Sequence, residues 1–371
     1  EPSGVRIMAY TTIDDPSAHH QTKIYTGNGN DGQAYTFDGN SDMQPDWLWV
    51  KNRNNTGPYS GHIFDSTRGA NKSLFPDETN AELTNSAYGY LGAFQSDGFT
   101  VTSGSSGDER VNNNNDTYVM WGWKANGGTT TSTSASGSTG DNTDIIASAR
   151  QTNTTAGFSI ITYTGDSTAG KKVTHGLGAT PEFIIIKNRD NGSEPWAVFT
   201  TTTGVKALAL NTTAAQATDS GYWSDTNPDS THFTVGSHGT TGAAAAFVAY
   251  AFTGIQGYSK FGVYKGNGNN DGPFVYTGFK PAWVMYKRSS DTGNWRILDN
   301  QRNTFNPINN EIYADLSNAE AQDTQMGFYA NGFKLRNGSS VGQNGNGSTY
   351  IYMAFAEHPF VSSKGVPVTA R

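Results

Sequence analysis

Three runs of consecutive apolar residues, each preceded by a proline and followed by a lysine, recur along the chain. They read PDWLWVK at 45–51, PEFIIIK at 181–187 and PAWVMYK at 281–287. An apolar run without polar alternation is typical of a strand that is covered on both faces. Proline at the start of a strand costs no ladder hydrogen bond. The pattern therefore predicts three equivalent buried strands.

A second recurring pattern, rich in aromatic residues, predicts a strand that closes each unit. It reads YVMWGWK from Tyr118, FVAYAFT from Phe247 and YIYMAFA from Tyr350, with a small residue always at the fifth position. A small residue inside an aromatic strand indicates that a neighbouring segment approaches closely. Two more strand patterns recur: KIYTG, IITYTG and FGVYKG open the units, and GFTV, HFTV and GFKL come shortly before the closing strands.

These recurrences decide the predicted fold class. They predict an all-β protein with three homologous β-sandwich-like repeats and long polar loops, here named unit 1, unit 2 and unit 3. The predicted divisions are an N-terminal arm at 1–20, unit 1 at 21–126, a Gly/Ser/Thr-rich linker at 127–156, unit 2 at 157–257, unit 3 at 258–360 and a C-terminal tail at 361–371. The polar composition of the linker is typical of a flexible or surface-hugging segment.

An S/T-x-x-E/Q sequence occurs in each unit, and the three copies end at Glu82, Gln216 and Glu320. In a capping box of this kind, the hydroxyl accepts a bond from the third amide of a helix and the Glu or Gln reaches back. The sequence therefore predicts one short capped helical turn in each unit. Catalytic carboxylates are the alternative for the two glutamates, but a cap tolerates Gln at this position and a general acid does not.

The composition excludes several classes of function. The 371 residues include no cysteine, which rules out disulfides, thiolate metal ligands and cysteine nucleophiles. Charged residues make up only 15%, and the net charge of -7 offers no basic footprint for nucleic acid or an anionic membrane. No apolar run reaches the roughly 18 residues that span a bilayer, so we expect no membrane insertion. No apolar signal segment follows Glu1, so we expect any export signal to have been removed or never to have existed.

The stretch YTGNGNDG at 25–32 contains G-x-G-x-x-G, but no helical pattern follows it, as a dinucleotide fingerprint requires. Calcium is a second interpretation of this loop and of its copy at 266–272, although each offers only one carboxylate. The calcium candidates are Asn28, Asn30, Asp31, Asn269, Asn270 and Asp271. The favoured interpretation is a plain corner in which Asn and Gly supply positive φ angles. We therefore expect no cofactor.

Units 1 and 3 share an Asp–Arg pair at a spacing of three residues. The pairs are Asp65 with Arg68 and Asp299 with Arg302, each after two apolar residues. This spacing predicts a salt bridge that locks a loop, and an active-site carboxylate with a positioning arginine is the alternative. No Ser/His/Asp, H-E-x-x-H or P-loop pattern occurs in the sequence. The sequence therefore predicts that the protein is not an enzyme.

Aromatic residues exceed what three separate cores need, and several lie in polar loops. Tyr59, Trp223 and Trp295 are the candidates for binding a glycan, because exposed rings beside Asn and Asp stack on sugar faces while polar groups bind the hydroxyls. The alternative is that these rings cover the edges of small sandwiches.

Longer motifs resemble a known family. The combination of VKNR, DSTRGAN and YVMWGWKANGGTT with THGLGATPEFIIIKNRD, and with GYSKFGVYKGNGNNDGPFVYTGFKPAWVMYKR and YIYMAFAEHPF, resembles repeat-containing phage virion proteins. These are abundant in marine phages, are associated with tail fibres and form a domain family of unknown function. The resemblance covers about residues 19 to 360. It implies an exterior, assembled, non-catalytic protein and transfers no catalytic residue.

We therefore expect a non-enzymatic structural protein of a virion surface, similar to a tail fibre or spike, that contributes to recognition of a bacterial surface glycan. The alternatives are a self-assembling extracellular filament or surface-coat subunit without a receptor role, and a polysaccharide depolymerase, which needs two carboxylates on facing walls of one groove. The expected partners are further copies of the chain and other virion proteins, and the resemblance to phage fibres favours a trimer. Low charge leaves little repulsion against such assembly.

Overall fold

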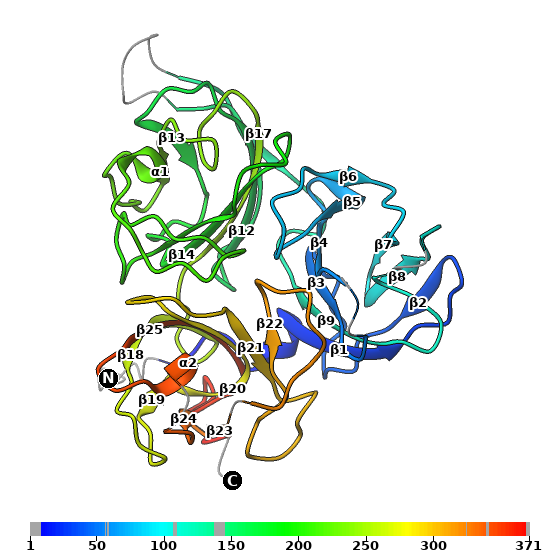
Figure 1. Ribbon diagram of the computed structural model, residues 1–371, viewed down its shortest axis with the longest axis vertical. Coiled ribbons are helices and arrows are strands. Elements are labelled where there is room, and N and C mark those ends of the chain that lie inside the picture. The colour runs from blue at the N-terminus through cyan, green and yellow to red at the C-terminus, as the bar shows by residue number, and fades with distance from the viewer. Residues whose placement is uncertain are drawn as a thin grey trace, which may run out of the picture.

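The computed structural model describes residues 9–368 except 56, 58, 107–109, 137–144, 324, 339 and 340. Three segments of the predicted arm, linker and tail therefore lie outside the described residues: 1–8, 137–144 and 369–371. The described chain is nearly all β and contains several separate sheets, as the patterns predict. Figure 1 shows three lobes arranged around a common centre, and each lobe corresponds to one unit.

Each unit contains one larger and one smaller antiparallel sheet. In unit 1 the orders are β1-β9-β3-β4-β5-β6 and β2-β8-β7. The strands are β1 His20–Thr26, β2 Gln33–Tyr35, β3 Trp47–Asn52, β4 His62–Asp65, β5 Gly69–Leu74, β6 Leu83–Thr84, β7 Tyr90–Gln95, β8 Gly98–Thr102 and β9 Thr117–Trp123.

In unit 2 the orders are β10-β11-β12-β17-β14-β15 and β13-β16. The strands are β10 Thr131–Thr133, β11 Ser148–Asn153, β12 Phe158–Thr164, β13 Lys171–Thr174, β14 Phe183–Asn188, β15 Ala197–Thr200, β16 His232–Val235 and β17 Ala246–Phe252. Two of these strands, β10 and β11, come from the predicted linker and extend the edge of the larger sheet. The linker is therefore not a flexible connection in these parts.

In unit 3 the orders are β18-β25-β20-β21-β22 and β19-β24-β23. The strands are β18 Ser259–Lys265, β19 Phe274–Tyr276, β20 Phe279–Arg288, β21 Arg296–Asp299, β22 Ile312–Tyr313, β23 Met326–Tyr329, β24 Gly332–Leu335 and β25 Thr349–Pro359. Short helical elements are a 3-10 turn η1 at Pro16–Ala18, α1 at Ser220–Trp223 and α2 at Val341–Asn344.

The register of the central strand pairs is the same in all three units. The small residue of each closing strand lies opposite the second apolar residue of the proline-led strand. The pairs are Leu48 with Gly122, Ile184 with Ala251 and Val284 with Ala354. The positions that align in the sequence are therefore equivalent in the sheets.

Gly122 shows why this position is small. A Cβ atom on Gly122 would lie 2.7 Å from Cζ of Phe37 and 3.1 Å from Cδ2 of Leu48. We expect Gly122→Ala to lower the free energy of unfolding by about 1–3 kcal/mol, because the added methyl overpacks a filled core. Chemical denaturation measures the effect. Gly192→Ala is the matched control, since its nearest neighbour would be at 3.4 Å, and equal stability of the two variants would contradict the expectation.

Alternate residues of the proline-led strands enter two different cores. In unit 1, Leu48 and Val50 pack between the two sheets of the unit, whereas Trp47 and Trp49 point to the opposite side. The opposite sides of all three larger sheets meet in one cluster, which we call the central core. Its members include Trp47, Trp49, Trp121 and Trp123 from unit 1, Phe158, Ile185, Tyr250 and Phe252 from unit 2, and Phe261, Trp283, Met285 and Phe355 from unit 3. Both faces of each larger sheet are covered, which explains the unbroken apolar runs.

Aromatic contacts join every pair of units in the central core. The ring centroids of Trp47 and Tyr250 are 4.8 Å apart, and those of Trp123 and Trp283 are 5.4 Å apart. Between units 2 and 3, the rings of Phe252 and Phe261 are separated by 6.0 Å. All eight tryptophans of the chain are fully buried. The excess of aromatic residues therefore fills a fourth core that the units share.

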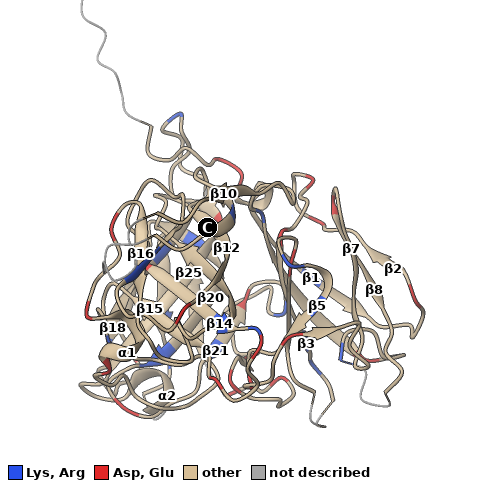
Figure 2. Cartoon of the chain, turned by 90° about the horizontal axis from the view of Figure 1, so that it is seen from above, with Lys and Arg blue, Asp and Glu red and all other residues tan. Residues whose placement is uncertain are grey.

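Charged residues are sparse on the ribbon, and most Asp and Glu lie in loops rather than in strands (Figure 2). Among the described residues, no helix is long and apolar enough to cross a membrane.

Candidate functional site at the junctions between units

The Asp–Arg pairs of units 1 and 3 form the salt bridges that the sequence predicts. Asp65 ends β4, and its Oδ1 accepts a bond from the backbone N–H of Arg68 at 2.8 Å. Its Oδ2 lies 2.5 Å from Nε of Arg68, and both side chains are inaccessible to solvent. Asp299 and Arg302 repeat this geometry with distances of 2.9 and 2.6 Å. Each pair closes a turn and places a complete ion pair in the interior.

A glutamate completes each pair from a neighbouring loop. Glu82 lies 2.9 Å from Nη1 of Arg68, and Glu320 lies 2.9 Å from Nη1 of Arg302. The capping-box prediction for these residues and for Gln216 is wrong, because residues 79–82, 213–216 and 317–320 form no helix. The short helices lie elsewhere: α1 is capped by Asp219, and α2 precedes the closing strand of unit 3.

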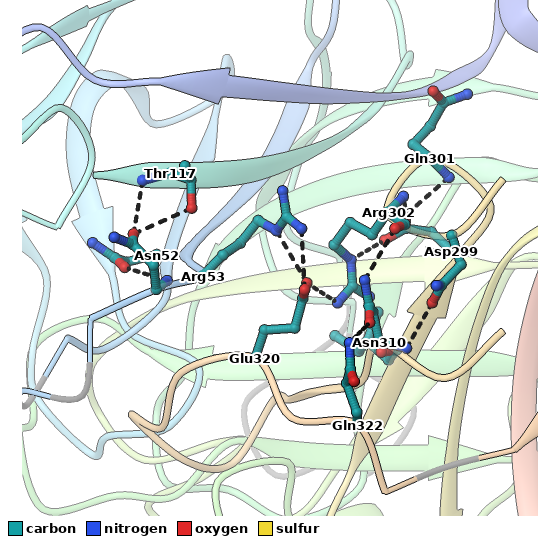
Figure 3. Close-up of polar contacts among 12 residues, drawn as sticks. Asn52, Arg53, Thr117, Asp299, Gln301, Arg302, Asn310, Glu320 and Gln322 are labelled. Atoms are coloured by element: carbon teal, nitrogen blue, oxygen red, sulfur yellow. Dashed lines mark hydrogen bonds and ion pairs between the residues drawn. The ribbon is translucent and has the colours of Figure 1, made fainter. Parts of the chain in front are cut away.

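The same glutamates join one unit to the next. Arg189 of unit 2 binds both carboxylate oxygens of Glu82 at 2.8 and 2.9 Å. Arg53 of unit 1 binds Glu320 of unit 3 in the same way, with both distances 3.0 Å. Figure 3 shows Glu320 between Arg53 and Arg302, with Asp299 on the far side of Arg302. These forked contacts cross the junctions between units 1 and 2 and between units 1 and 3.

The junction between units 2 and 3 has neutral residues where the other two junctions have glutamate and arginine. Gln216 of unit 2 corresponds to the two glutamates, and Ser289 of unit 3 stands where the other units have arginine. The backbone N–H of Gln216 donates to the carbonyl of Ser289 at 3.1 Å. The equivalent backbone bonds run from Glu82 to Arg189 at 2.8 Å and from Glu320 to Arg53 at 2.9 Å. A closed ring of backbone bonds therefore links the three units.

The lysines that end the proline-led strands form a second ring across the same three junctions, in which donation runs in the opposite direction. Their ammonium groups donate to carbonyls of the neighbouring unit. The bonds are Lys51 to Leu316 at 2.9 Å, Lys187 to Thr79 at 2.6 Å and Lys287 to Thr213 at 3.0 Å. Each lysine also donates to a carbonyl of its own unit. Burial lowers the pKa of each of the three lysines to about 8.

Residues of the closing strands contact the buried aspartates across the junctions. The hydroxyl of Tyr250 donates to Oδ2 of Asp65 at 2.7 Å, and Nε1 of Trp121 donates to Oδ2 of Asp299 at 2.9 Å. Burial alone would raise the pKa of Glu82, but the bond from Arg189 and the charge of Arg68 outweigh it and lower that pKa. Since their oxygens face fixed donors, these carboxylates stabilise the junctions and are unsuited to exchanging protons with a substrate.

The three rings predicted to bind a glycan do not fit that role. Trp223 and Trp295 are each 1% exposed and Tyr59 is 7% exposed, so none offers a face to a sugar. Trp295 crosses a junction, where its Nε1 donates to the carbonyl of Ala209 at 2.8 Å. Polar sequence neighbours therefore do not indicate that a ring is exposed, because all three of these rings are buried.

The loops proposed as calcium candidates are corners between the larger and smaller sheets. A buried asparagine fastens each of them: Asn112 donates to Asn28 and to the carbonyl of Asn30, and Asn344 holds the second loop similarly. Positive φ angles occur at Gly29 and Gly32. In the unit 1 loop, Oδ1 of Asp31 accepts from the amide of Ser103.

Oxygens of the unit 3 loop are also engaged. Asp271 binds Lys334 at 2.5 Å, and Oδ1 of Asn270 accepts from the amide of Gly338. The backbone N–H of Asn269 donates to Asn267. Within the part of the chain that the structure describes, no three His, Asp or Glu residues gather as a metal site would require.

A crevice of about 270 Å³ lies between units 1 and 3 and is the place where the depolymerase alternative can be tested. Asp15 and Asp38 line one wall, and Glu357 lines the other. Two of these carboxylates are paired, since Asp38 lies 2.7 Å from Lys23 and Glu357 lies 2.6 Å from Lys280.

Asp15 is held in its charged form by neighbouring hydroxyls. Burial would raise its pKa, but hydrogen bonds from Ser17 and Ser41, both 2.6 Å long, outweigh burial and lower that pKa. A glycosidase acid needs a raised pKa so that it carries a proton at neutral pH. Asp15 therefore does not have the properties of such an acid.

One comparison with known proteins identifies a family. A family model described as a domain of unknown function, DUF7483, matches residues 15–359. Neither a curated protein nor a solved structure gave a match. The matched segment begins just before β1, ends at the last residue of β25 and so includes both rings of contacts between units. The chain belongs to the DUF7483 family.

Proposed function

We propose that this protein is a non-enzymatic structural component of a virion surface or a comparable extracellular assembly, and that it recognises glycans there. The observation that carries the proposal is the double ring of contacts between units. The charged groups that sequence reasoning offered for catalysis are paired with one another and hold three lobes together. Such an arrangement suits a rigid body that presents loops and sheet faces to a partner.

Homotypic assembly remains part of the proposal, with the trimer favoured and a filament or surface coat as the alternative. All eight tryptophans are buried within one chain, so other side chains would have to form the contact between copies. Exposed apolar side chains suited to this are Leu83, Val263 and Val341. Sedimentation velocity at micromolar concentration tests assembly, and a monomer in every buffer would contradict it.

The non-enzyme proposal has its own test in the crevice between units 1 and 3. We expect the protein to release no reducing ends from acidic or neutral polysaccharides, and we expect Glu357→Gln to behave identically. A reducing-end assay against a protein-free control measures this. If the unaltered chain cleaves a polysaccharide and Glu357→Gln abolishes the cleavage without lowering the unfolding temperature, the protein is a depolymerase.

A further inference from the structure

The smaller sheet of unit 3 has one open face that carries large aromatic side chains. Val275 on β19 pairs with Phe333 on β24, and both point into the core of the unit. The residues next to them along each strand point to the opposite face. Phe274 and Tyr276 on β19 are 46% and 50% exposed. Rings this exposed forgo the burial that usually accounts for an aromatic residue in a strand. We therefore expect this face to contact another molecule.

Two of the rings lie close to the backbone of the sheet, because glycine occupies a neighbouring position in each case. A Cβ atom on Gly332 would lie 2.9 Å from Cζ of Phe274, and one on Gly327 would lie 2.6 Å from Cε2 of Tyr329. The centroids of the two rings are 6.3 Å apart, with 52° between their planes. The absence of a side chain at each glycine leaves room for the ring beside it.

Cations lie over two of the aromatic rings of this face. Cζ of Arg336 lies 5.6 Å from the centroid of the Tyr329 ring, and Nζ of Lys260 lies 5.1 Å from that of Tyr276. Lys334 stands beside Phe274 in register and pairs with Asp271. Three cations and one carboxylate make this face locally positive, although the whole chain carries a net charge of -7. A hollow of about 310 Å³ between Lys334 and Arg336 adjoins it.

Units 1 and 2 show that the fold does not need these rings. Phe274 pairs with Lys334 in unit 3, whereas Ala34 pairs with Thr100 at the same place in unit 1. Lys172 pairs with Thr234 in unit 2.

Tyr329 also has no aromatic counterpart in unit 1. It pairs with Gly332 across β23 and β24, and its counterpart in unit 1 is Gln95, which pairs with Gly98. The aromatic face is therefore a feature that unit 3 carries in addition to the shared architecture.

We propose that Phe274, Tyr276 and Tyr329 form a platform that binds an acidic polysaccharide. The exposed parts of the rings stack on the apolar faces of pyranose rings, and Lys260, Lys334 and Arg336 pair with carboxylates along the polymer. This inference rests on the proposed function and specifies where glycan recognition takes place. Binding of an acidic sugar polymer explains exposed rings beside cations better than a purely apolar partner does.

The test compares the unaltered chain with Phe274→Ala/Tyr329→Gln, which installs the residues of unit 1 and so should fold. Alginate is the acidic probe, dextran is the neutral probe, and Phe305→Ser removes an exposed ring that is not part of the platform. Calorimetry should show alginate bound more tightly than dextran, and more weakly as salt rises. The double variant should bind alginate at least about tenfold more weakly, whereas Phe305→Ser should match the unaltered chain.

Three outcomes would overturn the platform, and they are distinguishable. If alginate binds and the double variant binds equally well, glycan recognition stands and its site is elsewhere. If the unaltered chain binds neither polysaccharide, both the platform and the proposed glycan recognition fail. If the double variant instead loses self-association in sedimentation experiments without change in alginate binding, the occupant of this face is a second copy of the chain.

Discussion

Replacing Asp65 or Asp299 by asparagine should lower the free energy of unfolding by about 3–5 kcal/mol, as breaking a buried ion pair does. Oδ2 of Asp65 accepts bonds from Nε of Arg68 and from the hydroxyl of Tyr250. An asparagine that keeps its oxygen on the amide of Arg68 turns an NH2 group toward these two donors. The arginine charge then stays buried, but one of the two carboxylate charges that balance it has been removed.

Chemical denaturation of the two variants measures the loss. Asp38→Asn is the control, because it breaks a pair whose carboxylate is 77% exposed, and such surface pairs contribute about 0–1 kcal/mol. A loss at Asp65 or Asp299 no larger than that of the control would contradict the structural role of the buried pairs.

The corresponding turn of unit 2 suggests a variant of unit 3 that separates the effect of charge burial from that of packing. Thr200 and Thr203 occupy the Asp and Arg positions there, with a bond from the amide of Thr203 to Oγ1 of Thr200 at 3.1 Å. The double variant Asp299→Thr/Arg302→Thr copies this turn and leaves no unpaired charge at these positions. We expect it to be more stable than Asp299→Asn alone, since removing both partners avoids the cost of one buried charge. A less stable double variant would indicate that packing of the arginine dominates.

The fold could be predicted well from the apolar patterns, because each pattern reports which faces of a strand are covered. The run from Trp47 to Val50 indicates burial on both faces, and the small residue at Gly122 indicates a close neighbour. Neither pattern says what covers the second face. A second copy of the chain and another unit of the same chain bury Trp47 equally well, so the shared central core was beyond this reasoning.

Contacts between units were missed for a related reason. The partners Glu82 and Arg189 are 107 residues apart, and local spacing assigned the glutamate to a capping box. A signal was nevertheless present across the three units. Glutamate in one unit accompanies arginine in the next, and where Gln216 replaces the glutamate, its partner is Ser289. Comparing each unit with the next one, in a closed ring, would have paired the glutamates with the arginines.

The platform of unit 3 was missed because the search for binding rings used polar sequence neighbours as its criterion. Trp223 and Trp295 satisfy that criterion and are buried. Phe274 and Tyr276 lie in a strand, and their exposure depends on which sheet the strand joins. The useful signal would have been a comparison between units, since unit 1 has Ala34 where unit 3 has Phe274.

The largest pH effect should come from the three buried lysines at the junctions. Their pKa in the folded protein is about 8, whereas an unfolded lysine has about 10.5. Below pH 8 both states carry the proton, so burial of the charge is a constant cost. Between pH 8 and 10.5 the unfolded chain binds more protons than the folded chain, so the stability rises with pH. The expected slope is about 1 kcal/mol per pH unit for each lysine.

Buried tyrosines set the upper limit of this window. Burial raises the pKa of Tyr25, Tyr163 and Tyr264 well above the ordinary value of 10.0. Above pH 10 the unfolded chain therefore loses phenolic protons that the folded chain retains, and their contribution to stability falls. The two groups act in opposite directions, which places the maximum of stability between about pH 9 and 10.

Denaturation midpoints measured from pH 7 to 11 should trace this maximum. Lys287→Met should be less stable at every pH, because the carbonyls of Thr213 and Gly293 each lose a hydrogen bond. It should also show about two thirds of the rise between pH 8 and 9, where the tyrosines contribute little, since two of the three lysines remain. Lys265→Met, at an exposed position on β18, should leave the rise intact. A midpoint that falls steadily from pH 7 to 10 in the unaltered chain would mean that the three ammonium groups keep their protons in the folded state and that the lysine ring is charged throughout this range.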